Sequence, residues 1–240
     1  VDGTTVDVRR GTATEGGADS FDISLASGFD AGRFSAVYSL ELQSQTPLWA
    51  YERSQQDSTL DAPTESARAA RRAYLRTDYN DDYLDPGQAT CDALAGQNRG
   101  STQYAERPRY GFYCGSDRSI GYGTIVSGRK GFNSFGTMSY ELSDNAKLFA
   151  DFQFGISKVR LMYDVTAWAF EQSSSSADNY FYNGFTDQLE DWSRQFTPEE
   201  TGGFELQRIK QTTYSITPGI RGTVADKWNY ELSFNYSRYQ

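Results

Sequence analysis

Apolar and polar residues alternate with a period of two in several segments of the chain, the pattern of a β-strand with one apolar face. Segments 21–29 and 34–42 place Phe, Ile, Leu and Tyr at one set of alternate positions, and Asp, Ser, Glu and Gln at the other. The break at residues 30–32, Asp-Ala-Gly, has the chemistry of a turn. The two segments therefore predict an antiparallel hairpin.

The same pattern predicts two further hairpins and one single strand. Segments 136–142 and 148–156 form one pair, segments 214–220 and 228–236 form another, and each pair is joined by a turn of about four residues. Segment 4–10 is a weaker candidate strand ahead of the first hairpin. The alternation thus predicts an all-β chain with about seven long strands.

Short turns and long connections follow each other in strict order. The long connections are residues 46–130 and roughly 171–206. Transmembrane barrels have short turns on the periplasmic side and long loops outside, and their strands need about 9–11 residues to cross a bilayer. The order therefore predicts an antiparallel transmembrane β-barrel, of which residues 1–240 are a portion with two large extracellular loops. A secreted β-sandwich or β-helix is the alternative.

Composition supports a strand-built membrane protein over a helical one. The chain has 17 Tyr, 15 Phe and 4 Trp at a mean hydropathy of -0.67. No run approaches the ~18 apolar residues of a transmembrane helix. Aromatics near predicted strand ends, such as Phe29, Trp228, Tyr230 and Tyr239, are typical of the interfacial belts of a barrel.

Charge and residue types exclude several function classes. The net charge of -9 argues against a nucleic-acid partner, which needs a basic surface. The chain has no His, which excludes His-dependent hydrolases and His-ligated metal sites. Its 32 acidic residues are scattered without a discernible catalytic pair. We therefore expect no enzyme activity, no catalytic residue, no metal and no cofactor.

The only two cysteines, Cys91 and Cys114, lie in the first long connection. A single pair fits a disulfide in an oxidising compartment, whereas a zinc or redox site would need His or a CxxC motif. Residues 1–4 show no basic and apolar leader. Either a signal peptide has been removed or the sequence is a piece of a longer chain.

Aromatic residues and arginines gather in both long connections and are candidates for ligand binding. Such side chains grip a sugar ring or an anionic chelate by stacking and charge. The alternative is that they pack each loop onto itself, which the sequence favours for the first loop. Residues 63–75 predict a short surface helix, because Pro and Glu come first and arginines follow. The candidate ligand-binding residues are Tyr104, Arg107, Arg109, Tyr110, Tyr180, Tyr182 and Trp192.

Three stretches resemble the barrel of TonB-dependent outer-membrane receptors. They are the DSFDISLASGF segment at 19–29 with its hairpin, the SQTPLW segment at 44–49, and ITPGIRG at 216–222 followed by WNYELS at 228–233. The resemblance implies a 22-stranded barrel with an N-terminal plug that takes up a scarce ligand with TonB energy. The chain departs from the family in showing no plug, no TonB box and no C-terminal strand ending in an aromatic. We expect an early-to-middle portion of such a barrel.

The resemblance implies a receptor in the outer membrane of a Gram-negative bacterium. Its expected partners are the TonB complex, reached through parts of the protein outside this chain, outer-membrane lipid, and a small-molecule ligand such as a siderophore, cobalamin or an oligosaccharide. A passive porin remains an alternative, since arginines at 68–76 and aspartates at 78–85 resemble the opposed charges of a pore constriction. A secreted β-rich adhesin is the second alternative.

Overall fold

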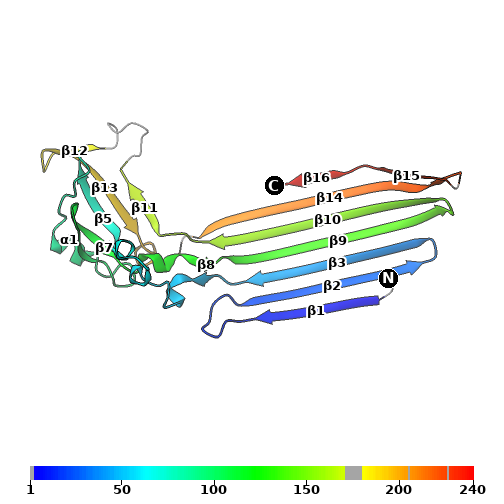
Figure 1. The fold of residues 1–240 in the computed structure, drawn as a ribbon, viewed down its shortest axis with the longest axis horizontal. Coiled ribbons are helices and arrows are strands. Elements are labelled where there is room, and N and C mark those ends of the chain that lie inside the picture. Colours follow the sequence, from blue (N-terminus) through cyan, green and yellow to red (C-terminus); the bar gives the residue numbers. More distant parts are fainter. Residues whose placement is uncertain (1–2, 171–179, 205, 226) are drawn as a thin grey trace. The chain divides into compact units, whose positions relative to one another are not determined.

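A computed structural model describes residues 3–170, 180–204, 206–225 and 227–240 (Figure 1). The chain divides into two compact units. The sheet unit comprises Val1–Pro47, Val126–Arg160 and Gln207–Gln240, and the insertion unit comprises Leu48–Ile125 and Leu161–Leu206. No helix in the described ranges is long and apolar enough to cross a membrane.

The sheet unit is built from one antiparallel sheet of eight strands in the order β1-β2-β3-β9-β10-β14-β15, with β16 also paired to β14. Because β15 and β16 follow each other along β14, the sheet has seven positions across. This confirms the predicted hairpins, the weaker first strand and the all-β antiparallel class. The strands are β1 (Gly3–Gly11), β2 (Ser20–Ala31), β3 (Phe34–Gln45), β9 (Gly128–Ser143), β10 (Ala146–Leu161), β14 (Gln207–Val224), β15 (Trp228–Ser233) and β16 (Tyr236–Tyr239).

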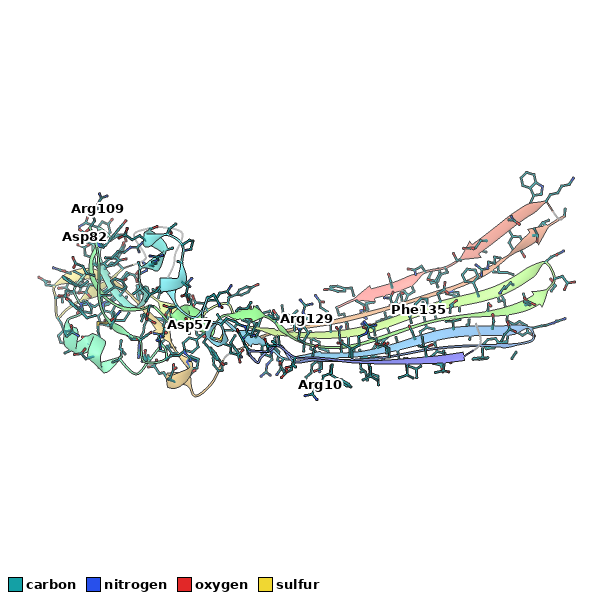
Figure 2. All side chains as sticks on the ribbon, turned by 60° about the horizontal axis from the view of Figure 1, so that its bottom comes forward. Arg10, Asp57, Asp82, Arg109, Arg129 and Phe135 are labelled. Carbon is teal, nitrogen blue, oxygen red and sulfur yellow. A yellow bond between two sulfur atoms is a disulfide. The ribbon has the colours of Figure 1, made fainter. Side chains whose placement is uncertain are left out.

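The register of the sheet aligns the alternation of all its strands. Leu40 of β3 lies opposite Leu25 of β2 and Ser134 of β9, and Ser134 lies opposite Phe154 of β10. Because a shift of one residue would move every side chain to the other face, this register gives the sheet one apolar face and one polar face. The strands form a single layer with side chains projecting from both faces (Figure 2).

The sheet does not close on itself within the described residues. Its edges are β1 on one side and β15 with β16 on the other. The antiparallel sheet is therefore established, whereas the predicted barrel remains a prediction. An edge strand carries unpaired backbone groups, which cannot be left unsatisfied in lipid.

The insertion unit contains a second antiparallel sheet that neither long connection forms alone. Strand β5 from the first connection pairs with β13 from the second, and the sheet runs in the order β11-β13-β5-β7-β6, with β12 on β13. Its strands are β5 (Arg71–Asp78), β6 (Gln103–Arg107), β7 (Gly111–Ser116), β11 (Thr166–Ala169), β12 (Phe181–Asn183) and β13 (Gln188–Phe196).

Short elements complete the insertion unit. Strands β4 and β8 form a two-stranded sheet of their own, and Tyr122, Met162 and Val165 form a buried cluster against Trp49 and Leu206. The elements are β4 (Leu48–Trp49), β8 (Thr124–Val126), α1 (Gln88–Ala93), α2 (Pro198–Thr201) and the 3-10 turns η1 (Ala50–Glu52), η2 (Thr59–Asp61), η3 (Glu65–Arg68) and η4 (Ser119–Tyr122).

The helix predicted over residues 63–75 is wrong beyond its first turn. Only Glu65–Arg68 is helical, as a 3-10 turn, and β5 begins at Arg71. The side chains of Ala73, Leu75 and Thr77 are buried in alternation. This period of two suits a strand between β13 and β7, and that pairing outweighs the helix-like charge order of the segment.

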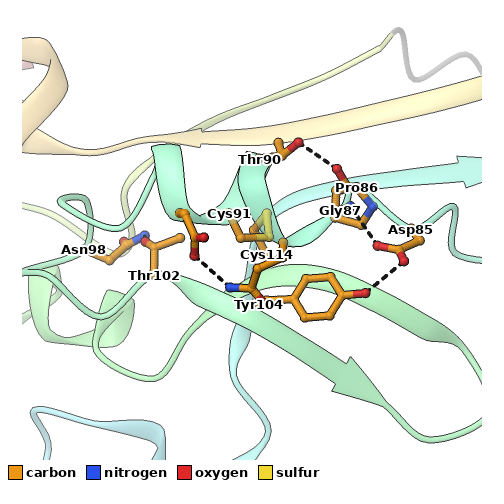
Figure 3. The surroundings of a disulfide bond; sticks show 11 residues. Asp85, Pro86, Gly87, Thr90, Cys91, Asn98, Thr102, Tyr104 and Cys114 are labelled. Carbon is orange, nitrogen blue, oxygen red and sulfur yellow. Dashed lines mark hydrogen bonds between the residues drawn. A yellow bond between two sulfur atoms is a disulfide. The ribbon is translucent and has the colours of Figure 1, made fainter.

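The predicted disulfide is confirmed and joins α1 to β7 (Figure 3). Cys91 and Cys114 are fully buried and their Cα atoms are 5.1 Å apart. Beside them the Tyr104 hydroxyl donates to Asp85 Oδ2 at 2.8 Å. The disulfide therefore links α1 covalently to the sheet of the insertion unit.

Replacing both cysteines by serine is expected to destabilise the insertion unit by about 3 kcal/mol, because the unfolded connection regains the freedom that a closed loop denies it. Urea titration followed by proteolysis within residues 79–110 measures the loss. Ser66→Ala, at an exposed position of the insertion unit, keeps the disulfide and serves as control. An unchanged urea midpoint in the double variant would show that the bond contributes nothing to this unit.

Candidate membrane face and ligand cavity

The apolar face of the large sheet has large hydrophobic side chains that no described element of the sheet unit covers. A soluble monomer rarely exposes a contiguous apolar patch beyond a few hundred square ångströms. Here the exposed side chains extend over all seven positions of the sheet. They include Val6, Val8, Phe21, Phe29, Tyr38, Leu40, Leu42, Met138, Tyr140, Leu142, Leu148, Ile216, Val224, Trp228, Leu232, Phe234 and Tyr236.

This apolar band has definite ends. Along β9 it runs from Phe132 to Tyr140, about 27 Å at roughly 3.4 Å per residue. Toward the short turns it ends in aromatic side chains, with Trp228 74% exposed. Toward the long connections it ends at Lys130, which lies directly opposite Lys158 of β10. An apolar band of this length between an aromatic and a charged border matches the span of a bilayer.

The opposite face of the sheet is polar and carries the acidic residues of the strands. Its side chains bond across strands, as in the 2.7 Å hydrogen bond between the Ser35 and Ser139 hydroxyls and the 3.2 Å bond from Asn133 Nδ2 to Glu41 Oε2. Phe135, labelled in Figure 2, is an exposed aromatic exception. The acids on this face are Asp7, Asp22, Asp30, Glu41, Glu141, Asp151 and Glu231.

The insertion unit contains a partly open cavity of about 530 Å³. One wall is the face of the sheet formed by alternate positions of β5, β13 and β11, and the other is the tip of the β6–β7 hairpin with the turn after β5. The cavity is polar and charged. Its charged and aromatic lining residues are Arg72, Asp81, Tyr83, Arg107, Tyr110, Asp191 and Arg194.

Two oxygen acceptors in the cavity wall are buried without a hydrogen-bond partner in the described structure. They are Oδ1 of Asp191 and Oε1 of Gln195, and Gln195 is only 9% exposed. Burial raises the pKa of Asp191, and the charge of Asp81 adds to that rise, while a hydrogen bond with the Trp192 backbone opposes it. Buried polar groups normally have a partner, so these acceptors suit a ligand with hydroxyl or amine donors.

On the face of the β5–β13 sheet that points away from the cavity lies a buried ion pair. Arg76 Nη2 lies 2.9 Å from Glu190 Oε1, and Trp192 Nε1 donates to Glu190 Oε2 at 2.6 Å. Burial favours the neutral carboxyl, but hydrogen bonds from Thr186, Trp192, Arg76 and Asn183 outweigh it and lower the pKa of Glu190 to about 2. This network fixes β13 to β5 and thereby positions Asp191 and Gln195.

Of the seven predicted ligand-binding residues, Arg107 and Tyr110 line the cavity, with the Arg107 guanidinium 5.3 Å from the Tyr110 ring centre. Tyr104 instead stacks on Phe112, and Trp192 packs edge-on against Tyr74. Tyr104 thus packs within the first connection, as the alternative for that loop expected, whereas Trp192 of the second connection packs against Tyr74 of the first. Their role in ligand binding stays a prediction.

The remaining three candidates lie outside the cavity lining. The Tyr180 hydroxyl donates to Asp81 Oδ1 at 2.9 Å, which raises the pKa of Tyr180 to about 12. Tyr182 is exposed and bonds Asp187, and Arg109 occupies the exposed tip of the β6–β7 hairpin with φ of 75°. Their role in ligand binding remains a prediction.

The cavity residues missed by sequence reasoning are Arg72, Tyr83, Asp191, Arg194 and Gln195. Asp191 and Gln195 sit at alternate positions of β13, a period-two signal that could have marked them as sharing a face. Arg72 joins them only because β5 pairs with β13 across the sheet. No sequence signal indicates that pairing.

No group of three or more His, Cys, Asp or Glu residues in the described parts of the chain is placed to hold a metal ion. Comparison with known proteins finds no matching family model, no matching curated protein and no matching solved structure.

Proposed function

We propose that the chain is part of an outer-membrane β-barrel of a Gram-negative bacterium that takes up a small ligand by TonB-coupled transport. The observation that carries the membrane proposal is the uncovered apolar face of a sheet with long strands. In this reading, the apolar band contacts hydrocarbon and the polar face lines a water-filled interior. Strands β1 and β15–β16 then pair with further strands that complete the wall, since open edges are not tolerated in lipid.

The order of the connections supports the same proposal. Residues 12–19, the 46–127 connection and the 162–206 connection all leave the large sheet at one end, whereas turns of two or three residues join strands at the other. This is the asymmetry of periplasmic turns and extracellular loops. The TonB coupling rests on the sequence resemblance alone, so a passive channel is the second candidate.

Ligand capture is assigned to the cavity of the insertion unit. Three arginines lining it complement an anionic group, and the two unpartnered acceptors complement hydroxyl donors. A ferric siderophore or an acidic oligosaccharide has both features. Tyr110 at the hairpin tip and Tyr83 beside it provide flat apolar surface for a ring.

Two experiments separate the candidate functions. Extraction of the protein from cell envelopes only by detergent supports a membrane protein, and recovery in plain buffer as a monomer supports an adhesin instead. Uptake of labelled ferric siderophores, cobalamin and oligosaccharides is then measured with and without a protonophore. Loss of uptake in de-energised cells supports active transport, whereas unchanged uptake supports a channel.

Arg107→Gln is expected to raise the half-saturating concentration of the transported ligand about tenfold or more, since a charge-assisted hydrogen bond contributes roughly 1.5–3 kcal/mol. The maximal uptake rate stays the same, because the step after capture is untouched. Arg118→Gln removes an equal charge at an exposed position outside the cavity and serves as control. Equal shifts in the two variants would place the ligand elsewhere.

A further inference from the structure

We infer that the apolar face of the large sheet carries a binding site for lipid phosphate at the end where the long connections leave it. The inference rests on the proposed membrane location of the sheet. It concerns a group of basic residues, here called the basic margin, which directly follows the apolar band. The basic margin comprises Arg10, Lys130, Lys158, Arg160, Arg208 and Lys210.

The register of the sheet places these residues in line. Arg10 lies opposite Phe21, Phe21 opposite Ser44, Ser44 opposite Lys130, and Lys130 opposite Lys158. This row therefore continues without a break from β1 to β10, and all its side chains share the face of the apolar band.

Strand β14 extends the row. A Cβ atom on Gly155 of β10 would lie 2.9 Å from Thr213 Oγ1 of β14, and the Thr223 amide donates to the Asn145 carbonyl at 3.0 Å. Both contacts fit one antiparallel register, which brings Lys210 level with Lys158. The same register brings Arg208 level with Arg160, so the basic margin has a second row.

The strands of the apolar face supply no acid to neutralise this charge, and Asp19, just before β2, is the acid that follows next in register. In the described strands of the large sheet, every Asp and Glu occupies a position on the polar face. Like charges directly opposite each other on neighbouring strands are destabilising, as for Lys130 and Lys158. An anion from outside the chain would remove that repulsion. From β1 to β14 the margin is about 24 Å wide at ~4.8 Å per strand, room for more than one anionic group.

The surroundings favour a phosphate on a lipid over a free phosphate ion. Phe132 and Ile156 lie opposite each other on the same face, each two residues from Lys130 and Lys158 respectively. A lipid can place its acyl chains on these apolar residues and its phosphate on the lysines. Long basic side chains reach the headgroup level from the edge of the hydrocarbon. The turn end of this face is bordered by aromatics instead, so the site belongs to one leaflet.

The test is lipid binding to the whole protein, purified in a neutral maltoside detergent, by native mass spectrometry. The test variant carries Lys130→Gln, Lys158→Gln and Lys210→Gln. The control carries Arg129→Gln, Lys147→Gln and Lys227→Gln, an equal loss of charge from outside the basic margin. The ligands are dioleoyl phosphatidic acid, dioleoyl phosphatidylcholine and inorganic phosphate.

Phosphatidic acid is expected to bind the natural protein, and the test variant at least tenfold more weakly, because each cation at an anionic surface strengthens binding by a factor of about five. The control stays within twofold and phosphatidylcholine binds all three forms alike. A single Lys158→Gln gives a smaller loss, and Lys158→Arg restores binding, which excludes misfolding as the cause.

Equal binding of phosphatidic acid to the test variant and the natural protein would overturn the inference. Margin-dependent binding of inorganic phosphate at the same affinity would also overturn it, since the site would then be for a free ion. A protein that is stable without detergent refutes the proposed membrane location itself. The two failures are thus distinguished.

Discussion

Leu40→Arg is expected to lower the stability of the membrane-inserted protein by roughly 2–4 kcal/mol, the cost of an arginine at the lipid-facing midplane of a barrel. Leu40 lies in the middle of the apolar band, opposite Leu25 and Ser134, and is 39% exposed in the sheet. The measurement is urea unfolding of the protein in lipid vesicles, followed by tryptophan fluorescence.

Ser39→Arg is the matched control for this experiment. Ser39 is the neighbouring residue on β3 and points to the polar face, where an arginine stays hydrated. Its expected effect is below ~1 kcal/mol, as for a lumen position. If Ser39→Arg proves the more damaging change, the sheet has its water-facing and lipid-facing sides reversed, or lies in no membrane at all.

Glu190→Gln is expected to destabilise the insertion unit by roughly 3–5 kcal/mol, because it leaves the partly buried Arg76 without a counter-charge. Glu190 is fully buried and the Arg76 side chain is 19% exposed. The exposed pair Arg71–Asp164 offers a control, and Asp164→Asn is expected to cost at most about 1 kcal/mol. Protease resistance of the insertion unit against urea measures both.

The lowered pKa of the Glu190 carboxylate also predicts how the stability of the insertion unit changes at acid pH. The folded-state pKa of Glu190 is about 2, below its ordinary value of 4.5. A lowered pKa adds stability that is fully present above pH 4.5 and is lost as the pH falls toward 2. Protease resistance of the natural protein should therefore decline across this window, and Glu190→Gln should flatten the decline. A decline of equal slope in the variant would assign the acid response to other groups.

The large sheet could be predicted from the sequence because the residues that specify each hairpin are close together in the chain. Alternation over ten or more residues and short polar turns specify each hairpin, as for the pairing of Ile23 with Leu42. Closure is different, since the edges β1 and β15–β16 pair with nothing in the chain described here. Alternation therefore predicted strands, and the barrel required an argument from loop lengths.

The insertion unit could not be predicted in the same way because its pairings are distant. Strand β5 meets β13, with Thr77 opposite Asp191. Its strands have three to nine residues, too few for a period-two pattern to be recognised in the sequence. The cavity residues are hard to predict for the same reason, because distant strand pairings bring them together. Arg107 and Tyr110 were found through their local chemistry, while Gln195 acquires its neighbours only through the pairing of β13.

The pairing of β5 with β13 also sets an order of events during biosynthesis. Export into the oxidising compartment delivers β5 ahead of β13, so the 46–127 segment emerges there without the partner for one side of its sheet. The disulfide between Cys91 and Cys114 lies wholly within this segment and can form early. Until the second connection follows, Ala73 and Leu75 of β5 stay uncovered. A chain with exposed apolar residues and an unpaired strand edge is prone to aggregate, and we expect it to bind a chaperone.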